Sequence, residues 1–68
     1  MKYIEIQKKY YNEEMMLWQV TFQIHGQTNY KGQPDINMVG VKSKYMINED
    51  GTVKSDDTLM DFLNSTYL

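Results

Sequence analysis

Residues 15–25 read MMLWQVTFQIH, and they alternate apolar and polar side chains more regularly than any other part of the chain. A period of two places successive side chains on opposite faces of an extended strand. We therefore expect a half-buried β-strand here, with its even-numbered side chains turned to a core. These even-numbered residues are Met16, Trp18, Val20, Phe22 and Ile24.

The preceding residues 2–11 alternate more weakly and predict the first strand of a hairpin with residues 15–25. Paired residues of two strands share a face, so the apolar Ile4 and Ile6 must oppose even-numbered partners. A three-residue loop at positions 12–14 satisfies this condition, and so does a five-residue loop. The shorter loop is our preferred register, and it pairs Ile6 with Val20, Ile4 with Phe22 and Tyr10 with Met16.

Residues 38–47 and 52–54 predict a second hairpin. The segment between them, NEDGT at positions 48–52, is typical of a type I turn followed by a left-handed Gly51 and a bulge. That turn opposes Ile47 to Val53, so both apolar side chains lie on one face. The polar residues 26–37 hold two glycines and the only proline, and they predict a long connection.

The C-terminal residues 56–66 change to a helical period, with Leu59, Phe62 and Leu63 on one stripe. Ser55 is a good N-cap candidate. The predicted fold is therefore α+β, a single small domain over residues 1–68, in which an antiparallel sheet of about four strands packs one face against the helix. The predicted core is Ile4, Ile6, Trp18, Val20, Phe22, Ile24, Val39, Val41, Tyr45, Ile47, Val53, Leu59, Phe62 and Leu63.

The length and composition bear on the stability of the chain and on where in the cell it is found. A chain of 68 residues buries only about 60% of the surface that its unfolded state exposes, and this one has no cysteine with which to add a disulfide. Its start does not resemble a signal peptide, and no apolar run approaches the ~20 residues of a membrane span. We expect a cytoplasmic protein that does not enter the membrane.

The sequence contains no recognisable catalytic set, and we expect no enzyme, no cofactor and no metal site. His25 is the only histidine, and it lies at the end of a strand without a nucleophile motif nearby. Asp50 and Gly51 resemble part of a calcium loop, but the spaced ligands and the downstream glutamate of such loops are missing.

The charge is uneven along the chain. Residues 1–47 carry a net charge of +2 and residues 48–68 a net charge of −4. The chain lacks Arg and Ala and is rich in Lys, Asn, Tyr and Ile, a composition typical of AT-rich coding. In size and composition it resembles the short accessory proteins of low-GC bacteria and their phages.

Three residues form the first candidate site. Met15 and Leu17 occupy odd-numbered positions of the strand and should lie outside the core, beside Tyr11. Exposed methionine and aromatic side chains suit adaptable protein contacts. The main hypothesis is a small non-catalytic module that binds a protein partner or a second copy of itself. A mere packing role for these side chains is an equally open alternative.

Single-stranded nucleic acid is the alternative partner. Lysines interleaved with tyrosines on a sheet face can neutralise phosphates and stack with bases. An ordinary solvated face is the simpler interpretation, because the net charge is −2 and there is no arginine. The residues of this alternative site are Tyr3, Lys9, Tyr11, Lys42 and Lys44.

Overall fold

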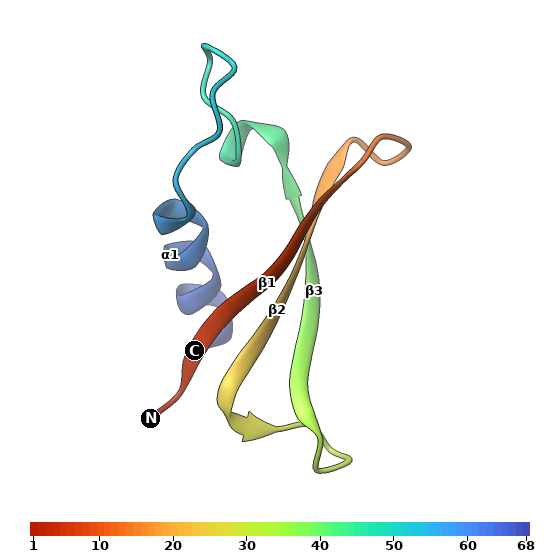
Figure 1. Cartoon of the computed structure of the whole chain (residues 1–68), viewed down its shortest axis with the longest axis vertical. Coiled ribbons are helices and arrows are strands. Elements are labelled where there is room, and N and C mark those ends of the chain that lie inside the picture. Colours follow the sequence, from red (N-terminus) through yellow and green to blue (C-terminus); the bar gives the residue numbers. More distant parts are fainter.

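A computed structural model describes all 68 residues. The chain forms an antiparallel sheet followed by a helix (Figure 1), with the sheet strands in the order β1-β2-β3. The molecule is elongated, measuring 42 × 25 × 16 Å. The elements are β1 (Tyr3–Asn12), β2 (Leu17–Thr28), β3 (Pro34–Lys42), a short 3-10 helix η1 (Ser43–Tyr45) and the helix α1 (Asp56–Tyr67).

The α+β class is confirmed, but the sheet has three strands rather than about four. The expected pairing of Ile47 with Val53 is confirmed, although it forms an isolated bridge and not a hairpin of two strands. The turn between them has the expected geometry, because Gly51 has a φ of +87° and the Asn48 amide donates to the Thr52 carbonyl at 2.8 Å. Only two residues are paired, which is too few for a fourth strand.

The long connection predicted at residues 26–37 is instead the second hairpin of the sheet. β2 continues to Thr28, and β3 begins at Pro34. The tight turn between them is held by the Asn29 side-chain oxygen, which accepts from the backbone amides of Lys31 at 2.9 Å and Gln33 at 3.0 Å. This is an Asx-type turn, in which a side chain replaces a backbone acceptor.

The register of the first hairpin differs by two residues from the preferred prediction. Ile4 opposes Ile24 and Ile6 opposes Phe22, so the predicted pair of Ile6 with Val20 is wrong. Up to Ile6, this shift of two leaves every side chain on its expected face, since the side-chain period is also two. This part of the hairpin has the register of the five-residue loop. Tyr10 lies further along β1 and opposes Gln19 and not Met16, a shift of three residues.

An irregularity at Gln7 then changes the faces of β1. The register shifts between Ile6 and Lys8, which leaves Gln7 as one extra residue on this strand. Beyond it Lys9 opposes Val20 and Tyr11 opposes Trp18. The odd-numbered residues in the second half of β1 therefore face the same side as the core residues of β2. We call this feature the Gln7 bulge.

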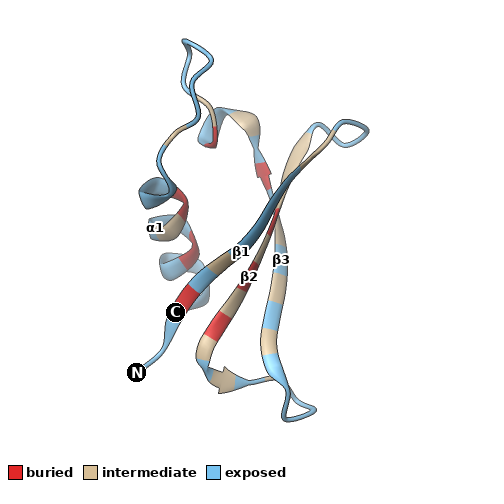
Figure 2. Ribbon diagram, viewed as in Figure 1, coloured by how far each residue is buried: buried red, intermediate tan, exposed pale blue.

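The core lies between α1 and one face of the sheet (Figure 2). Three members of the predicted core are instead substantially exposed: Tyr45 is 52%, Val53 64% and Phe62 44% accessible. The reason at Tyr45 is the turn of η1, which breaks the alternation and places Met46 inside in its stead. The buried residues are Ile4, Val20, Phe22, Ile24, Val41, Met46, Leu59 and Leu63.

The helix α1 agrees closely with the predicted span, ending one residue later. Leu59 and Leu63 enter the core, and the Tyr67 ring packs 4.8 Å from the ring of Phe22. Ser55 occupies the N-cap position without making a side-chain hydrogen bond. An ion pair from Lys9 of β1 to Asp56, at 2.7 Å, ties the start of the helix to the sheet instead.

Candidate protein-binding surface

The sheet has one face that no other element covers. We call it the outer face, and it lies opposite the face that packs against α1 (Figure 1). The two registers assign its side chains: Tyr3, Glu5, Lys8, Tyr10 and Asn12 from β1, Leu17, Gln19, Thr21, Gln23 and His25 from β2, and Ile36, Met38, Gly40 and Lys42 from β3.

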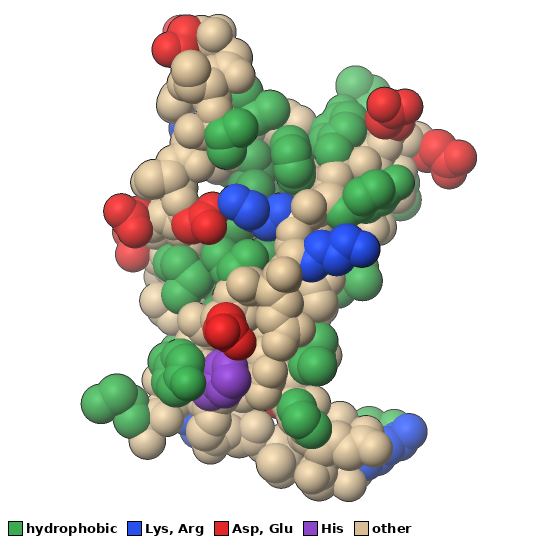
Figure 3. All heavy atoms as spheres, in the orientation of Figure 1, with side chains coloured by type: hydrophobic (Ala, Val, Ile, Leu, Met, Phe, Trp, Pro, Cys, Tyr) green, Lys and Arg blue, Asp and Glu red, His purple; other side chains and the backbone are tan.

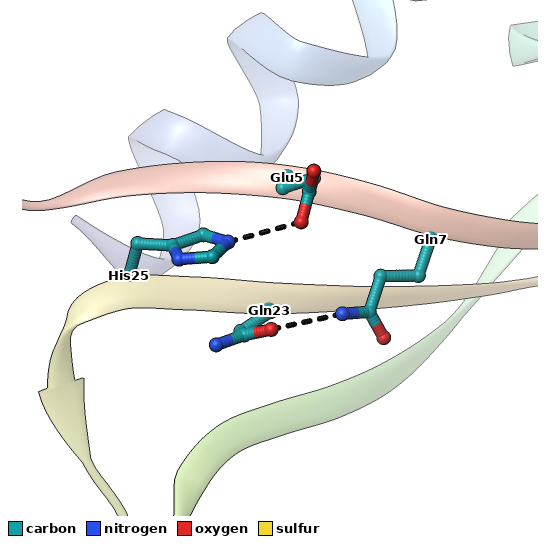
Figure 4. A network of polar contacts seen from close by, with 4 residues as sticks. All are labelled: Glu5, Gln7, Gln23 and His25. Atoms are coloured by element: carbon teal, nitrogen blue, oxygen red, sulfur yellow. Dashed lines mark hydrogen bonds and ion pairs between the residues drawn. The ribbon is translucent and has the colours of Figure 1, made fainter.

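The half of the outer face near the N-terminus is polar and internally paired. The Tyr3 and His25 rings stack, with centroids 4.6 Å apart and planes inclined by 7°. His25 Nε2 lies 3.0 Å from Glu5 Oε1, and the Gln7 amide donates to Gln23 Oε1 at 2.9 Å (Figure 4). These groups bond to one another across β1 and β2, so the polar half has few unpaired groups to offer to a ligand.

The other half of the outer face contains an apolar hollow of about 310 Å³. Met15 and Met38 stand at its edge, each 63% exposed, and Leu17 and Gln19 line it from β2. The hollow exists because Gly40 has no side chain, and a Cβ at that position would lie 3.4 Å from Leu17 Cδ1. We call this hollow the outer recess. Its flexible methionine and leucine walls can adapt to an inserted side chain.

The structure brings together two of the three residues first expected to bind a protein. Met15 and Leu17 both line the outer recess. Tyr11 does not join them, because the Gln7 bulge turns it to the helix side, where its ring lies 5.5 Å from that of Trp18. The expectation that Tyr11 faces outward is therefore wrong, and its role is to extend the packing around Trp18.

The residues of the nucleic-acid alternative are dispersed over the molecule. Tyr3 and Lys42 lie at opposite ends of the outer face. Lys9 faces the helix side, contrary to expectation, and is paired with Asp56. Lys44 belongs to η1, outside the sheet. No continuous row of lysines and tyrosines results, and Tyr11 is also on the helix side.

Ile36, Met38 and Gly40 are surface residues that the sequence analysis missed. Ile36 was missed because residues 26–37 were interpreted as a connection, although β3 begins at Pro34. Met38 and Gly40 lie within the strand predicted at 38–47, but only its apolar face with Val39 and Val41 was considered. A signal was present nonetheless, because Ile36 and Met38 follow a period of two on the face opposite to Val39. Apolar residues on both faces of a strand indicate a second contact surface besides the core.

A second apolar hollow, of about 450 Å³, lies between α1 and the end of β3. Its lining includes the buried Val41 and Leu59 and the half-exposed Tyr45 and Phe62. This hollow is a continuation of the core, whose residues form its floor. The outer recess differs because it lies on the face that α1 leaves uncovered.

The Asp50 carboxylate is held within its own turn. In the 48–52 turn the hydroxyl and the amide of Thr52 donate to the Asp50 carboxylate, at 2.6 and 3.0 Å, and hold the pKa of Asp50 below its ordinary value. No three His, Asp or Glu side chains gather closely enough to hold a metal ion. The single α-helix, of twelve residues, is too short to cross a bilayer.

No known protein family matches the chain, and neither does any curated protein or solved structure.

Proposed function

We propose that this chain is a small non-catalytic protein-binding module that acts in the cytoplasm and binds through its outer face. The outer recess is the observation that supports this function. It would receive an apolar side chain of the partner. An accessory role in a low-GC bacterium or a phage would suit a module of this size.

The contiguity of the apolar side chains favours an interface over chance exposure. Single exposed apolar residues are normal on soluble proteins. Here Met15, Leu17 and Met38 meet around one hollow, and Ile36, 53% exposed, continues the strip along β3. Contiguous apolar patches on a surface mark interaction sites more often than scattered residues do.

Site-specific photo-crosslinking tests the proposal. A benzophenone side chain is introduced at Met38, beside the recess, and at Asn64 on the exposed side of α1 as the matched control. Both variants are irradiated as purified protein and in bacterial lysate. We expect protein adducts from position 38 that disappear when Gly40→Thr fills the recess, and no adducts of this kind from position 64. Equal yields at the two positions, or none at position 38, would contradict the proposal.

A further inference from the structure

We infer that the partner of the outer face is a second copy of this chain, related to the first by a twofold axis parallel to β2. This inference rests on the proposed function and names its partner. It is carried by the arrangement of side chains in three successive rows across the sheet, in which the β1 member of each row complements the β3 member.

The central row is Tyr10, Gln19 and Gly40, which oppose one another across β1, β2 and β3. The outer strands lie at equal distances of about 4.8 Å on the two sides of β2. A half turn about an axis parallel to β2 therefore places β1 of one copy over β3 of the other. Tyr10, 54% exposed, then enters the outer recess at Gly40 of the second copy, and the same contact forms a second time by symmetry.

The neighbouring rows are complementary under the same rotation. One row is Lys8, Thr21 and Met38, so the alkyl part of Lys8 covers the exposed Met38 of the other copy. The other row is Asn12, Leu17 and Lys42, which brings Lys42 to the end of the other copy's β1.

The turn that follows Asn12 supplies charges for Lys42. Glu13 and Glu14 are exposed there, and acidic side chains are visible at this tip (Figure 3). Within one chain the only lysine paired with a carboxylate is Lys9, with Asp56, so Lys42 has no carboxylate partner of its own. In the twofold dimer, Lys42 of each copy lies near Glu13 and Glu14 of the other copy, so this charge pairing forms two times.

The size of the face sets the strength of the association. Three strands about 4.8 Å apart, with about ten residues of about 3.3 Å each, present a projected area of roughly 480 Å². Two such faces bury about 950 Å², which is below the roughly 1,200–2,000 Å² of stable interfaces. We therefore expect a folded monomer in reversible equilibrium with a dimer, with a dissociation constant on the order of 100 μM.

Sedimentation velocity over a concentration series tests this dimer directly. The wild-type chain should move from its 8.1 kDa monomer toward twice that mass as concentration rises. Gly40→Thr should weaken the dimer by at least about tenfold because the side chain fills the recess. Gly40 has no positive φ, so a β-branched residue suits its strand and the monomer should remain folded by circular dichroism.

A charge swap gives the second test. Lys42→Glu should weaken the dimer, and the triple change Lys42→Glu, Glu13→Lys, Glu14→Lys should restore it by reversing the same pair. Lys31→Glu is the matched control at the far turn, and it should leave the dimer unchanged. A wild-type chain that stays monomeric up to millimolar concentration would overturn the inference. A dimer whose dissociation constant is unchanged by both Gly40→Thr and Lys42→Glu would also overturn it.

The two proposals fail separately. Adducts of position 38 with other proteins, from a chain that sediments as a monomer, would refute the second copy and leave protein binding standing. Position-38 adducts at dimer mass would support both. Absence of adducts together with a monomer at every concentration would refute both.

Discussion

The two faces of the sheet are built from the same strands but have opposite environments. On the helix side Val20 and Phe22 are fully buried against α1. On the outer face, Met38 stands 63% exposed beside a hollow, and Thr21 between it and Lys8 is polar. The difference follows from the alternation in β2, since its even-numbered residues pack into the core and its odd-numbered residues form the face that no other element covers.

The Gln7 bulge changes which residues of β1 face the helix side: even-numbered ones before it and odd-numbered ones after it. Before it, Ile4 faces the helix side of the sheet, and after it Lys9 and Tyr11 do. Tyr10 is thereby turned outward, into the row that contains Gly40. One extra residue thus decides that Tyr11 packs beside Trp18 and that Tyr10 lies on the outer face.

The largest expected effect is that of a single-residue deletion in β2, which turns part of the strand so that core side chains face outward. Deleting Gln19 flips one half of β2 relative to the other and sends Trp18 to the outer face or Val20 out of the core. We expect that variant to lose cooperative unfolding in urea, followed by circular dichroism. Deleting Gln7 only removes the bulge, because Ile6 and Lys8 already face opposite sides, and that variant should still unfold cooperatively. Equal damage from the two deletions would contradict the assigned faces.

Truncation of a core side chain should have the second-largest effect, on the free energy of unfolding. Phe22→Ala should lower the free energy of unfolding by about 3–5 kcal/mol, which approaches the whole stability of a small domain. Met38→Ala, the matched change on the outer face, should lower it by less than about 0.5 kcal/mol. Urea unfolding monitored by Trp18 fluorescence measures both. A large loss from Met38→Ala in dilute protein would mean that the outer face belongs to the core of the monomer.

Removal of the ion pair between the sheet and the helix should have a smaller effect. Lys9→Gln should cost about 0.2–1 kcal/mol at low salt, since both side chains are partly exposed, and the loss should fade as salt is added. Lys31→Gln provides the control, because Lys31 lies in the turn between β2 and β3. If the two variants have the same stability at low salt, the 2.7 Å contact does not persist in solution.

The smallest effect should come from the 48–52 turn. The pKa of Asp50 is lowered in the folded chain, chiefly by the Thr52 hydroxyl, so its contribution to stability is present above the ordinary pKa of 3.8. It is lost as the pH falls through the lower, folded pKa. Asp50→Asn should therefore flatten the acid side of the stability curve slightly, as followed by unfolding at a series of acidic pH values. An unchanged curve would show that the turn does not distinguish the ionised carboxylate.

Elements with agreeing local signals could be predicted from the sequence. Residues 17–25 have apolar residues at a period of two, and residues 56–66 combine a helical stripe with acidic residues at the start. Gly51 is predicted in the left-handed region because the turn pattern and the apolar phase favour the same register. The outward position of Leu17 follows from the alternation, but the expectation that Met16 faces the core is wrong: Met15 and Met16 lie in the turn before β2, where Met16 has a φ of +55° and is 71% exposed.

Features that depend on tertiary packing could not be predicted in this way. Gln7 is polar with polar neighbours on its C-terminal side, so no local pattern shows that it is the extra residue of a bulge. Tyr45 continues a period-two pattern, yet η1 replaces the strand there and buries Met46. The outer recess depends on Gly40 lying beside Leu17, which requires the register of β3 with β2.

Backbone amide chemical shifts across a dilution series test the central claim most directly. As the protein is diluted from millimolar to tens of micromolar, we expect shift changes at Tyr10, Gln19, Met38, Gly40 and Lys42, with the amides of α1 unmoved. Such a result would assign folding to one face of the sheet and association to the other. Changes centred on α1, or no change at any amide over that range, would contradict the account.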